Sequence, residues 1–314
     1  MERLRSKVLE GESARNSTLV RNLLEKKRLL DQGDNTHERI KTALVMGGGG
    51  VRGAFGAGVL VGLEQLGFHD TFDVVVGVSS GAADLAYFLA KQTELGASLW
   101  HEDLVDRRFI DVRRLRRVLD LDYAEHIMRK TKPLDQETIR SSRSSFFIVV
   151  TDAQTGKSEF IDVKEECDIV KVVIASSAFP IVYNRTISIN GKKYSDGSIG
   201  NGIPIDLAIQ EGCTDILVVL NNTVGERANG ASLLERLLTS VYMRKFSSEF
   251  RTAMLARHKQ YSRAAELIGL HGDSINIGII APSEMPISRI SQDREKIFDL
   301  AMTGKKQVLD LFSL

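Results

Sequence analysis

The chain has 314 residues, 43% of them hydrophobic and 26% charged, which is the composition of a globular protein with room for one α/β domain and an insertion. The formal net charge of +1 excludes a protein that binds nucleic acid through bulk positive charge, so we expect no nucleic-acid partner. Cys167 and Cys213 belong to no CxxC motif or Cys/His cluster, which excludes a disulfide scaffold and a structural zinc site. The polar N-terminus and the lack of a long uninterrupted apolar run predict a cytoplasmic protein without a transmembrane helix.

The first 41 residues are rich in charge and carry leucines at helical spacing, which predicts a helical extension ahead of the main domain. From residue 42 to the end, short apolar runs alternate with helical segments. This alternation is typical of a mostly parallel sheet with helices on both faces. We therefore expect one three-layer α/β domain over residues 42–314. Its strands are predicted at residues 42–46, 71–78, 145–151, 158–163, 186–189, 192–194, 215–220 and 274–280.

Helical patterns fill most of the intervals between these strands. The dipeptide Asn190-Gly191 predicts a two-residue hairpin turn. Residues 100–143 are dominated by Asp, Arg and Leu, with few strand signals, and predict an inserted, mostly helical cap. The other helices are predicted after the glycine run through Leu66, at residues 82–92 and 170–177, from Pro204, at residues 232–270, and at residues 291–314 with an interruption at Thr303-Gly304.

A G-x-S-x-G motif runs from Gly77 through Ser79 to Gly81, between a predicted strand and a predicted helix. In this context a tight turn projects the serine hydroxyl, and the N–H groups at the start of the helix point toward the substrate. Ser79 is therefore a candidate nucleophile. The alternative interpretation is a glycine-rich crossover turn without chemistry.

Four consecutive glycines, residues 47–50, follow the first strand, and Gly53 comes three residues later. One interpretation is a dinucleotide fingerprint, with Asp70 or Asp73 as its acidic residue. A P-loop is excluded because no Lys-Ser/Thr follows the last glycine. The third interpretation is an oxyanion hole made of backbone amides, and it alone also accounts for Ser79.

The third motif is Asp196-Gly197, which follows the predicted hairpin; by itself such a pair is usually a turn. The three motifs in this order resemble the patatin-like phospholipase family, whose pattern is G-G-G-x-[RK]-G, then G-x-S-x-G, then D-G-[GA]. The resemblance covers about residues 42–220 and includes the segment 175–180 before the aspartate. Ser198 departs from the pattern, since the family has Gly or Ala there.

The resemblance implies a patatin-like fold and a serine lipid acyl hydrolase of phospholipase A or lysophospholipase type. It implies that Ser79 is the nucleophile and Asp196 its base. The substrate would be a phospholipid or another acyl-ester lipid, and we expect no metal or other cofactor. Arg52 would orient the glycine loop or lie near an anionic head group, and the alternative is a salt bridge that only fixes the loop. The oxyanion hole would consist of the amides of Gly48, Gly49 and Gly50.

Two other functions stay open on the sequence alone. One is a Ser-His-Asp esterase, because the chain order Ser79, Asp196, then His258 or His271 satisfies the α/β-hydrolase order. The other is a nucleotide-binding or regulatory protein that does not hydrolyse its ligand. Two basic segments, residues 107–117 and 236–263, predict peripheral contact with an anionic membrane, with an ordinary solvated face as the alternative.

Overall fold

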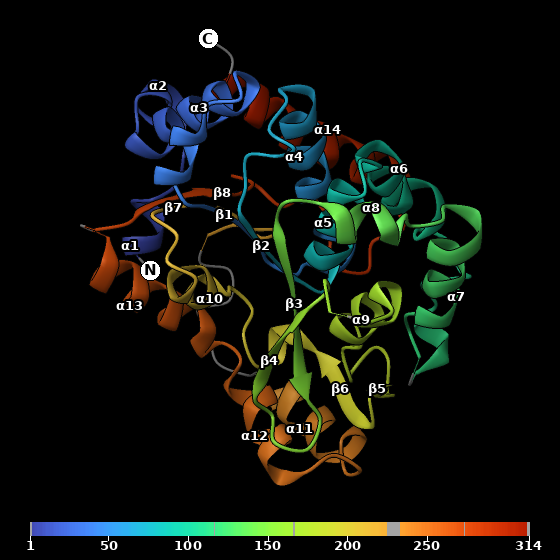
Figure 1. The fold of residues 1–314 in the computed structure, drawn as a ribbon. Helices are drawn as coiled ribbons and strands as arrows, with labels where there is room; N and C mark the ends of the chain where they lie inside the picture. The colour runs from blue at the N-terminus through green and yellow to red at the C-terminus, as the bar shows by residue number, and fades with distance from the viewer. Residues whose placement is uncertain (1, 116, 166, 225–232, 273, 313–314) are drawn as a thin grey trace.

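The computed structural model describes residues 2–115, 117–165, 167–224, 233–272 and 274–312, and its centre is one mixed sheet (Figure 1). The strands β3, β2, β1, β7 and β8 lie in that order and pair in parallel. β4, β6 and β5 add antiparallel pairs beyond this parallel core. The bounds are β1 (Thr42–Met46), β2 (Val74–Val78), β3 (Ser145–Asp152), β4 (Ser158–Asp162), β5 (Ile187–Ile189), β6 (Lys192–Asp196), β7 (Asp215–Val219) and β8 (Asn276–Ile280).

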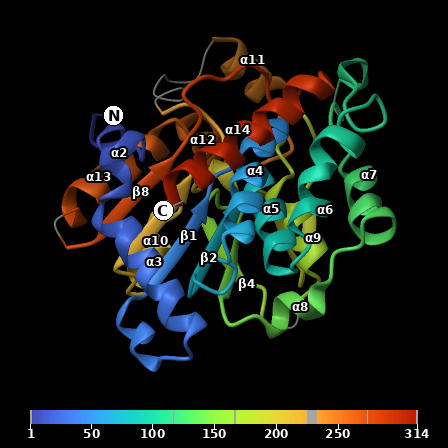
Figure 2. The same ribbon diagram turned by 90° about the horizontal axis from the view of Figure 1, so that it is seen from above.

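Helices cover both faces of the sheet, which confirms the predicted three-layer architecture (Figure 2). Because side chains alternate along a strand, Leu44 and Met46 of β1 join one core, and Ala43 and Val45 join the other. The first core is covered by α4 (Gly53–Gln65), α5 (Ser80–Leu89), α9 (Ile169–Ser176) and α14 (Arg294–Phe312). The second is covered by α1 (Glu2–Arg5), α10 (Ile205–Gln210) and α13 (Lys259–His271).

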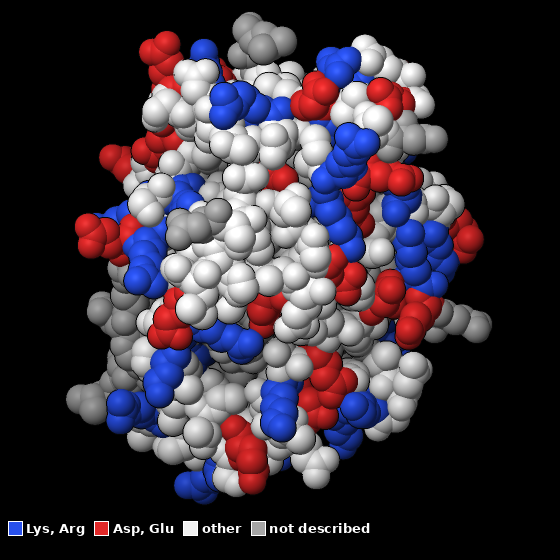
Figure 3. Space-filling view, turned by 60° about the vertical axis from the view of Figure 1, so that its left-hand side comes forward, with Lys and Arg blue, Asp and Glu red and all other residues white. Residues whose placement is uncertain are grey.

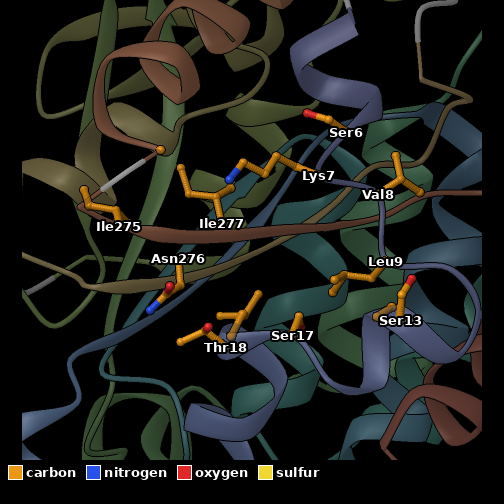
Figure 4. A pocket seen from close by; sticks show the side chains of 13 residues that line it. Ser6, Lys7, Val8, Leu9, Ser13, Ser17, Thr18, Ile275, Asn276 and Ile277 are labelled. Carbon is orange, nitrogen blue, oxygen red and sulfur yellow. The ribbon is translucent and has the colours of Figure 1, made fainter.

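The N-terminal extension contains α1, α2 (Gly11–Arg15), α3 (Thr18–Asp31) and a short helix at Asn35–Arg39, and it packs on the edge of β8. Val8 forms a parallel bridge with Ile279, and a cavity of about 300 Å³ lies between the extension and β8 (Figure 4). Lys26 of α3 is fully buried and donates to the carbonyl oxygen of Ile40 and to the Asp73 carboxylate. The extension therefore contributes buried contacts to the domain.

The segment between α5 and β3 is mainly helical and lies beside α5 and α9. Ile110 forms an antiparallel bridge with Leu119, and the N–H groups of Asp111 and Asp120 donate to the carbonyl oxygens of Val118 and Phe109. The helical elements are α6 (Thr93–Ser98), Leu99–Asp103, Val112–Arg114, α7 (Leu121–His126), Ile127–Thr131 and α8 (Gln136–Ser141).

Most predicted boundaries differ from the structure by a few residues, and two differences are larger or have a clear cause. β2 begins at Val74, three residues later than predicted. The helical stretch 232–270 is divided into α11 (Leu233–Tyr242), α12 (Ser248–Ala256) and α13, because Ser247 caps α12 by accepting from the N–H of Phe250 at 3.0 Å. Residue 232 lies outside the described residues.

The interruption predicted at Thr303-Gly304 is wrong, because α14 runs unbroken from Arg294 to Phe312. Gly304 faces α4, where an added Cβ would lie 2.2 Å from the carbonyl oxygen of Phe55. This glycine permits close packing of two helices and does not end one. Residues 313–314 of the same predicted helix lie outside the described residues. Among the described residues, no helix combines the length and apolarity needed to cross a membrane.

Candidate active site

The candidate site forms where β1 and β2 end. The two strands are parallel neighbours, with Met46 paired to Gly77, so the glycine loop after β1 and Ser79 after β2 emerge at the same edge of the sheet. Carboxyl ends of parallel strands are the usual place for ligand sites in such folds. An added Cβ on Gly48 would lie only 2.9 Å from the Cβ of Ser79, so the loop backbone lies directly against this serine.

Ser79 has a backbone conformation that L residues rarely adopt, with φ of 54° and ψ of −124°. Such strain persists only where the surroundings hold it. The Oγ of Ser176, on α9, accepts the backbone N–H of Ser79 at 2.8 Å and donates to the carbonyl oxygen of Val149 at 2.6 Å. No role was predicted for Ser176, although it lies in the segment 175–180 that resembles the family.

Asp196, the last residue of β6, lies near Ser79 because β6 runs antiparallel to β2. One residue of β3 can pair with only one strand on each edge. β4 and β6 both pair with Thr151, so they lie on opposite edges of β3. β2 and β4 both pair with Val149, so they also lie on opposite edges. Hence β2 and β6 share one edge of β3 and run toward each other. Val78 pairs with Val149 and Asp196 with Val150, so Ser79 turns out of the sheet where β6 ends.

The Asp196 carboxyl group is 3% exposed, and its Oδ1 accepts the backbone N–H of Ser198 at 2.8 Å. Its carbonyl oxygen accepts the hydroxyl of Thr151 at 2.8 Å. Gly197 follows in a tight position, because an added Cβ would lie 2.1 Å from the carbonyl oxygen of Val149. These contacts fix the backbone of the motif beside β3.

The three glycine amides that the resemblance implies as an oxyanion hole are not equivalent. The N–H of Gly49 donates to the Oγ of Ser80 at 2.8 Å, so it is already engaged inside the loop. Gly50 has φ of 61° and lines the same cavity as Ser79, while Gly48 lies against the serine itself. Gly48 and Gly50 therefore lie near Ser79, while the N–H of Gly49 is engaged by Ser80.

Two buried amide side chains after β7 support the loop, and sequence reasoning missed both. Asn221 accepts the N–H of Gly56 at 2.9 Å and donates to the carbonyl oxygen of Gly47 at 2.9 Å. Asn222 donates to the carbonyl oxygen of Gly48 at 3.2 Å. The only sequence signal is a pair of polar residues directly after an apolar strand, at the edge where the other loops emerge.

Arg52 contacts the chain on the far side of the loop. Its guanidinium donates to the carbonyl oxygen of Ile287 at 2.8 Å and to the Oδ1 of Asn222 at 3.0 Å. Arg289 donates to the same Oδ1 at 2.8 Å, and its carbonyl oxygen accepts the N–H of Val51 at 3.1 Å. These contacts fit a residue that orients the loop.

An apolar cavity of about 60 Å³ opens beside Ser79. Its polar lining residues are Ser79, Ser80, Ser177 and Arg289, and the backbone of Gly50 also lines it. None of the six histidines lines it, and the ring of His258 contacts the carbonyl oxygen of Leu255 on α12 at 3.1 Å. Its apolar walls include Leu99, Trp100, Leu104, Phe109, Leu119, Leu121, Ala124, Met128, Val173 and Ile174.

The carboxyl group of Asp84, one turn after Ser80 on α5, stands behind this wall and was also missed. It is 3% exposed, and its Oδ1 accepts the indole N–H of Trp100 at 2.7 Å. Its Oδ2 is buried without a hydrogen-bond partner among the described residues. Burial raises the pKa of Asp84 well above its ordinary range, and the hydrogen bond from Trp100 opposes this only in part.

The acidic residues needed by a dinucleotide site lie away from the glycine loop. Asp73 precedes β2, at the opposite end of the parallel strands, where it binds Lys26 and accepts the N–H of Thr42 at 2.7 Å. Asp70 is exposed and contacts His69. Within the described parts of the chain, no group of three or more His, Cys, Asp or Glu side chains is placed to hold a metal ion.

The family model described as patatin-like phospholipase matches residues 44–209, more than half of the chain. The chain belongs to the patatin-like phospholipase family. The uncharacterized protein YjjU of Escherichia coli strain K12 is 30% identical over 186 residues, which are 57% of this chain and 51% of that protein. The chain thus spans about half the length of this curated relative.

Two solved structures are similar to this chain at lower sequence identity than YjjU. VipD from Legionella pneumophila has a TM-score of 0.47 at 13% identity, covering 86% of this chain and 67% of VipD. ExoU of Pseudomonas aeruginosa, solved in complex with SpcU, has a TM-score of 0.31 at 12% identity, covering 74% of this chain and 52% of the other.

Proposed function

We propose that this protein is a serine lipid acyl hydrolase of phospholipase A or lysophospholipase type. Ser79 is its nucleophile and Asp196 its general base. Family membership supports a lipid hydrolase in general. The observation that carries the assignment to these two residues is the junction of β2 and β6 on one edge of β3, beside the glycine loop.

The reaction needs only these groups and water. Asp196 takes the hydroxyl proton as the Oγ of Ser79 attacks the ester carbonyl carbon, and the carbonyl oxygen becomes an oxyanion. The amides of Gly48 and Gly50 donate to that oxyanion. The carbon–oxygen bond to the alcohol then breaks, Asp196 returns its proton to the leaving alkoxide, and the acyl group stays on Ser79. Water activated by Asp196 hydrolyses this acyl-serine and restores both residues.

The buried position of Asp196 suits this task. A carboxylate in a desolvated site is a stronger base than one in water, because burial disfavours its charge. Dyad chemistry of this kind requires no histidine, which fits a cavity wall without one. A nucleotide-binding function receives less support, since Asp73 lies at the opposite end of the strands and is occupied by Lys26 and Thr42.

Peripheral contact with an anionic membrane is the second part of the proposal. The cap arginines are largely paired within their own segment, Arg113 with Asp111 at 2.8 Å and Arg117 with Asp122 at 2.6 Å, while Arg116 lies outside the described residues. On the face in Figure 3, basic and acidic side chains are mixed around an uncharged area. The segment 236–263, where Arg244 and Lys259 are exposed, is a better candidate for membrane contact than the cap arginines.

The proposed activity is tested with a fluorophosphonate probe and a p-nitrophenyl ester in a buffer without metal or cofactor. We expect hydrolysis by the wild-type protein, covalent labelling at Ser79, and loss of both in Ser79→Ala. Ser80→Ala is the matched control, since its hydroxyl accepts from Gly49 and is not the proposed nucleophile. Labelling at Ser80, or full activity of Ser79→Ala, would overturn the assignment.

A further inference from the structure

A second cavity lies where the cap meets the chain at the end of α11, and it shares no lining residue with the cavity beside Ser79. Its walls come from Arg117 of the cap and from residues 183–185 and 241–245. Figures 1 and 2 show α11 and the loops before α7 on the same side of the molecule. Three segments that are distant in sequence therefore build one cavity, to which the proposed chemistry gives no role.

Hydrogen bonds hold these three segments together. The N–H of Leu119 in the cap donates to the carbonyl oxygen of Val182 at 3.0 Å. The side-chain amide of Asn184 donates to the carbonyl oxygen of Tyr242 at 3.2 Å, and its own carbonyl oxygen accepts the ammonium group of Lys245. The cavity walls are thus fixed to one another on both sides of residues 182–184.

The walls of this cavity are positively charged. Within the described part of the chain, four lining side chains are cationic and none is acidic, the cations being Arg117, Arg185, Arg244 and Lys245. Behind the wall, Asp120 contacts Arg117 at 2.5 Å, and Asp122 is shared between Arg117 at 2.6 Å and Arg185 at 3.5 Å. Even without Lys245, three guanidinium groups lie near two carboxylates, so the cavity attracts an anion.

Asp122 positions the two guanidinium groups from the cap side. One of its oxygens accepts the hydroxyl of Tyr183 at 2.8 Å, and the other contacts Arg117 and Arg185. Burial and the bond to Asp122 raise the pKa of Tyr183 to about 12, so its hydroxyl keeps its proton at neutral pH. Guanidinium groups held in this way suit a phosphate, whose oxygens they bind in pairs.

Apolar side chains are exposed in two of the segments that build the cavity. Seven large apolar side chains are exposed among the described residues, and four of them are Val112 and Leu115 in the cap and Leu237 and Val241 on α11. These four are between 49% and 69% exposed. Exposed apolar side chains beside cationic ones are typical of segments that lie in a membrane interface. A soluble anion would need only the cations, so the apolar neighbours favour a phosphate at a lipid surface.

We propose that the cavity formed by Arg117, Arg185, Arg244 and Lys245 binds the phosphomonoester head group of an anionic phospholipid, phosphatidic acid being the simplest, while the exposed apolar side chains around it enter the lipid surface. A phosphomonoester carries about two negative charges near neutral pH, more than a phosphodiester, and so matches the positive wall better. The inference rests on the membrane contact of the proposed function and not on the proposed hydrolysis.

The test is the sedimentation of Ser79→Ala protein with vesicles, since this variant should leave the lipid intact. The vesicles contain phosphatidylcholine with either phosphatidic acid or cholesteryl hemisuccinate, an anionic lipid without phosphate, adjusted to equal zeta potential. We expect at least about fivefold tighter binding to the phosphatidic acid vesicles, the effect of roughly one basic side chain at an anionic surface. Equal zeta potential removes the contribution of diffuse surface charge from this comparison.

Variants in the same background separate the cavity from net charge. The double variant Arg185→Gln, Arg244→Gln should bind phosphatidic acid vesicles about 25-fold more weakly, or about fivefold for each side chain, and should lose the preference over hemisuccinate. Arg21→Gln, Arg39→Gln is the matched control, because both side chains are exposed on the N-terminal extension. This control removes the same charge and should change binding by less than about twofold.

The apolar part of the surface has its own pair of variants. Leu237→Ser should weaken binding to both kinds of anionic vesicle about fivefold or more, because the leucine side chain no longer leaves water. Leu270→Ser is the control, since Leu270 is 77% exposed on α13, outside the two apolar segments. All four substituted side chains of the test and charge-control variants are exposed, and circular dichroism checks that the fold is kept.

Glycerol 3-phosphate without vesicles distinguishes a head group from a free phosphate, and we expect no binding by calorimetry. Binding of this soluble phosphate that depends on Arg185 and Arg244, without a preference for phosphatidic acid vesicles, would overturn the lipid assignment. If the protein binds neither kind of anionic vesicle, the proposed membrane contact and this inference fail together, and ester hydrolysis still tests Ser79 separately. If phosphatidic acid and hemisuccinate vesicles bind equally, or the double variant behaves like its control, the membrane contact stands and the phosphate site is overturned.

Discussion

The hydroxyl of Ser176 accepts the backbone N–H of Ser79 at 2.8 Å, and this contact joins the proposed nucleophile to a helix residue 97 positions further along the chain. The same hydroxyl donates to the carbonyl oxygen of Val149, beside the residue that pairs with Asp196. Ser176 therefore touches the backbone on both sides of the proposed dyad. It is a positioning residue, since it acts through Ser79.

Replacing Ser176 with Ala should lower kcat by roughly tenfold to a hundredfold, because small misplacement of a reacting group has effects of this size. The free energy of unfolding should fall by about 1–3 kcal/mol, since two buried backbone groups lose their partner. Ser144→Ala is the control, as that buried hydroxyl donates to Phe72 at 2.6 Å before β3 begins, at the opposite end of the sheet. Equal loss of kcat in both variants would show that Ser176 serves stability alone.

Asp196→Asn should reduce kcat by about 10²–10⁴, because the amide keeps the shape of the carboxyl group and its contact with Ser198 but cannot take a proton. His258→Ala and His271→Ala should retain activity close to that of the wild-type protein. Steady-state kinetics with a soluble ester, together with the melting temperatures, checks this prediction. A comparable loss in either histidine variant would favour a Ser-His-Asp triad.

The buried carboxyl group of Asp84 predicts a pH dependence of stability. Its folded-state pKa lies well above the ordinary value of 3.8, so the folded protein holds its proton over a range where the unfolded chain has released it. Its contribution to stability is complete below about pH 4 and is lost as the pH rises toward the folded-state pKa. Asp84→Asn has no such proton and should become more stable relative to the wild-type protein between pH 4 and pH 8.

Urea unfolding of both proteins at several pH values measures this difference. A difference in the free energy of unfolding that stays constant from pH 4 to pH 8 would mean that Asp84 is ionised in the folded protein. Circular dichroism at each pH shows whether both proteins start from the same folded state.

Membrane contact through the segment 236–263 should depend on salt. Each basic side chain near an anionic surface contributes about 1 kcal/mol, and this attraction is screened over ~10 Å at 0.1 M salt. Binding to vesicles that contain phosphatidylglycerol should therefore decrease with added salt and in the double variant Arg244→Gln, Lys259→Gln. Hydrolysis of a soluble ester should not change. Equal binding to neutral and anionic vesicles at every salt concentration would identify these side chains as a solvated face.

The features that the sequence predicted correctly are local. Strand and helix periodicity located the parallel core, and Asn190-Gly191 forms the predicted turn with φ of 48° and 83°. The G-x-S-x-G motif located the strained turn at Ser79, because the small residues that such a turn needs are close neighbours in the sequence.

What the sequence could not indicate depends on contacts between distant segments. Asn221 binds Gly56 across 165 residues, and Trp100 binds the buried Asp84 only because α5 and the cap pack together. Gly304 is a second case in which a contact between distant segments decides the role of a residue. A glycine within a helical pattern indicates an interruption when read locally, and its packing against Phe55 becomes visible only in the fold.

The segment 44–209 that matches the family is not a self-sufficient unit. The partners that hold its glycine loop, Asn221 and Arg289, lie beyond its end, and the buried ammonium group of Lys26 lies before its start. If residues 44–209 were excised as a fragment, β1 would lose β7, and the Asp73 carboxylate would lose its partners Lys26 and Thr42. We expect such a fragment to be insoluble or inactive.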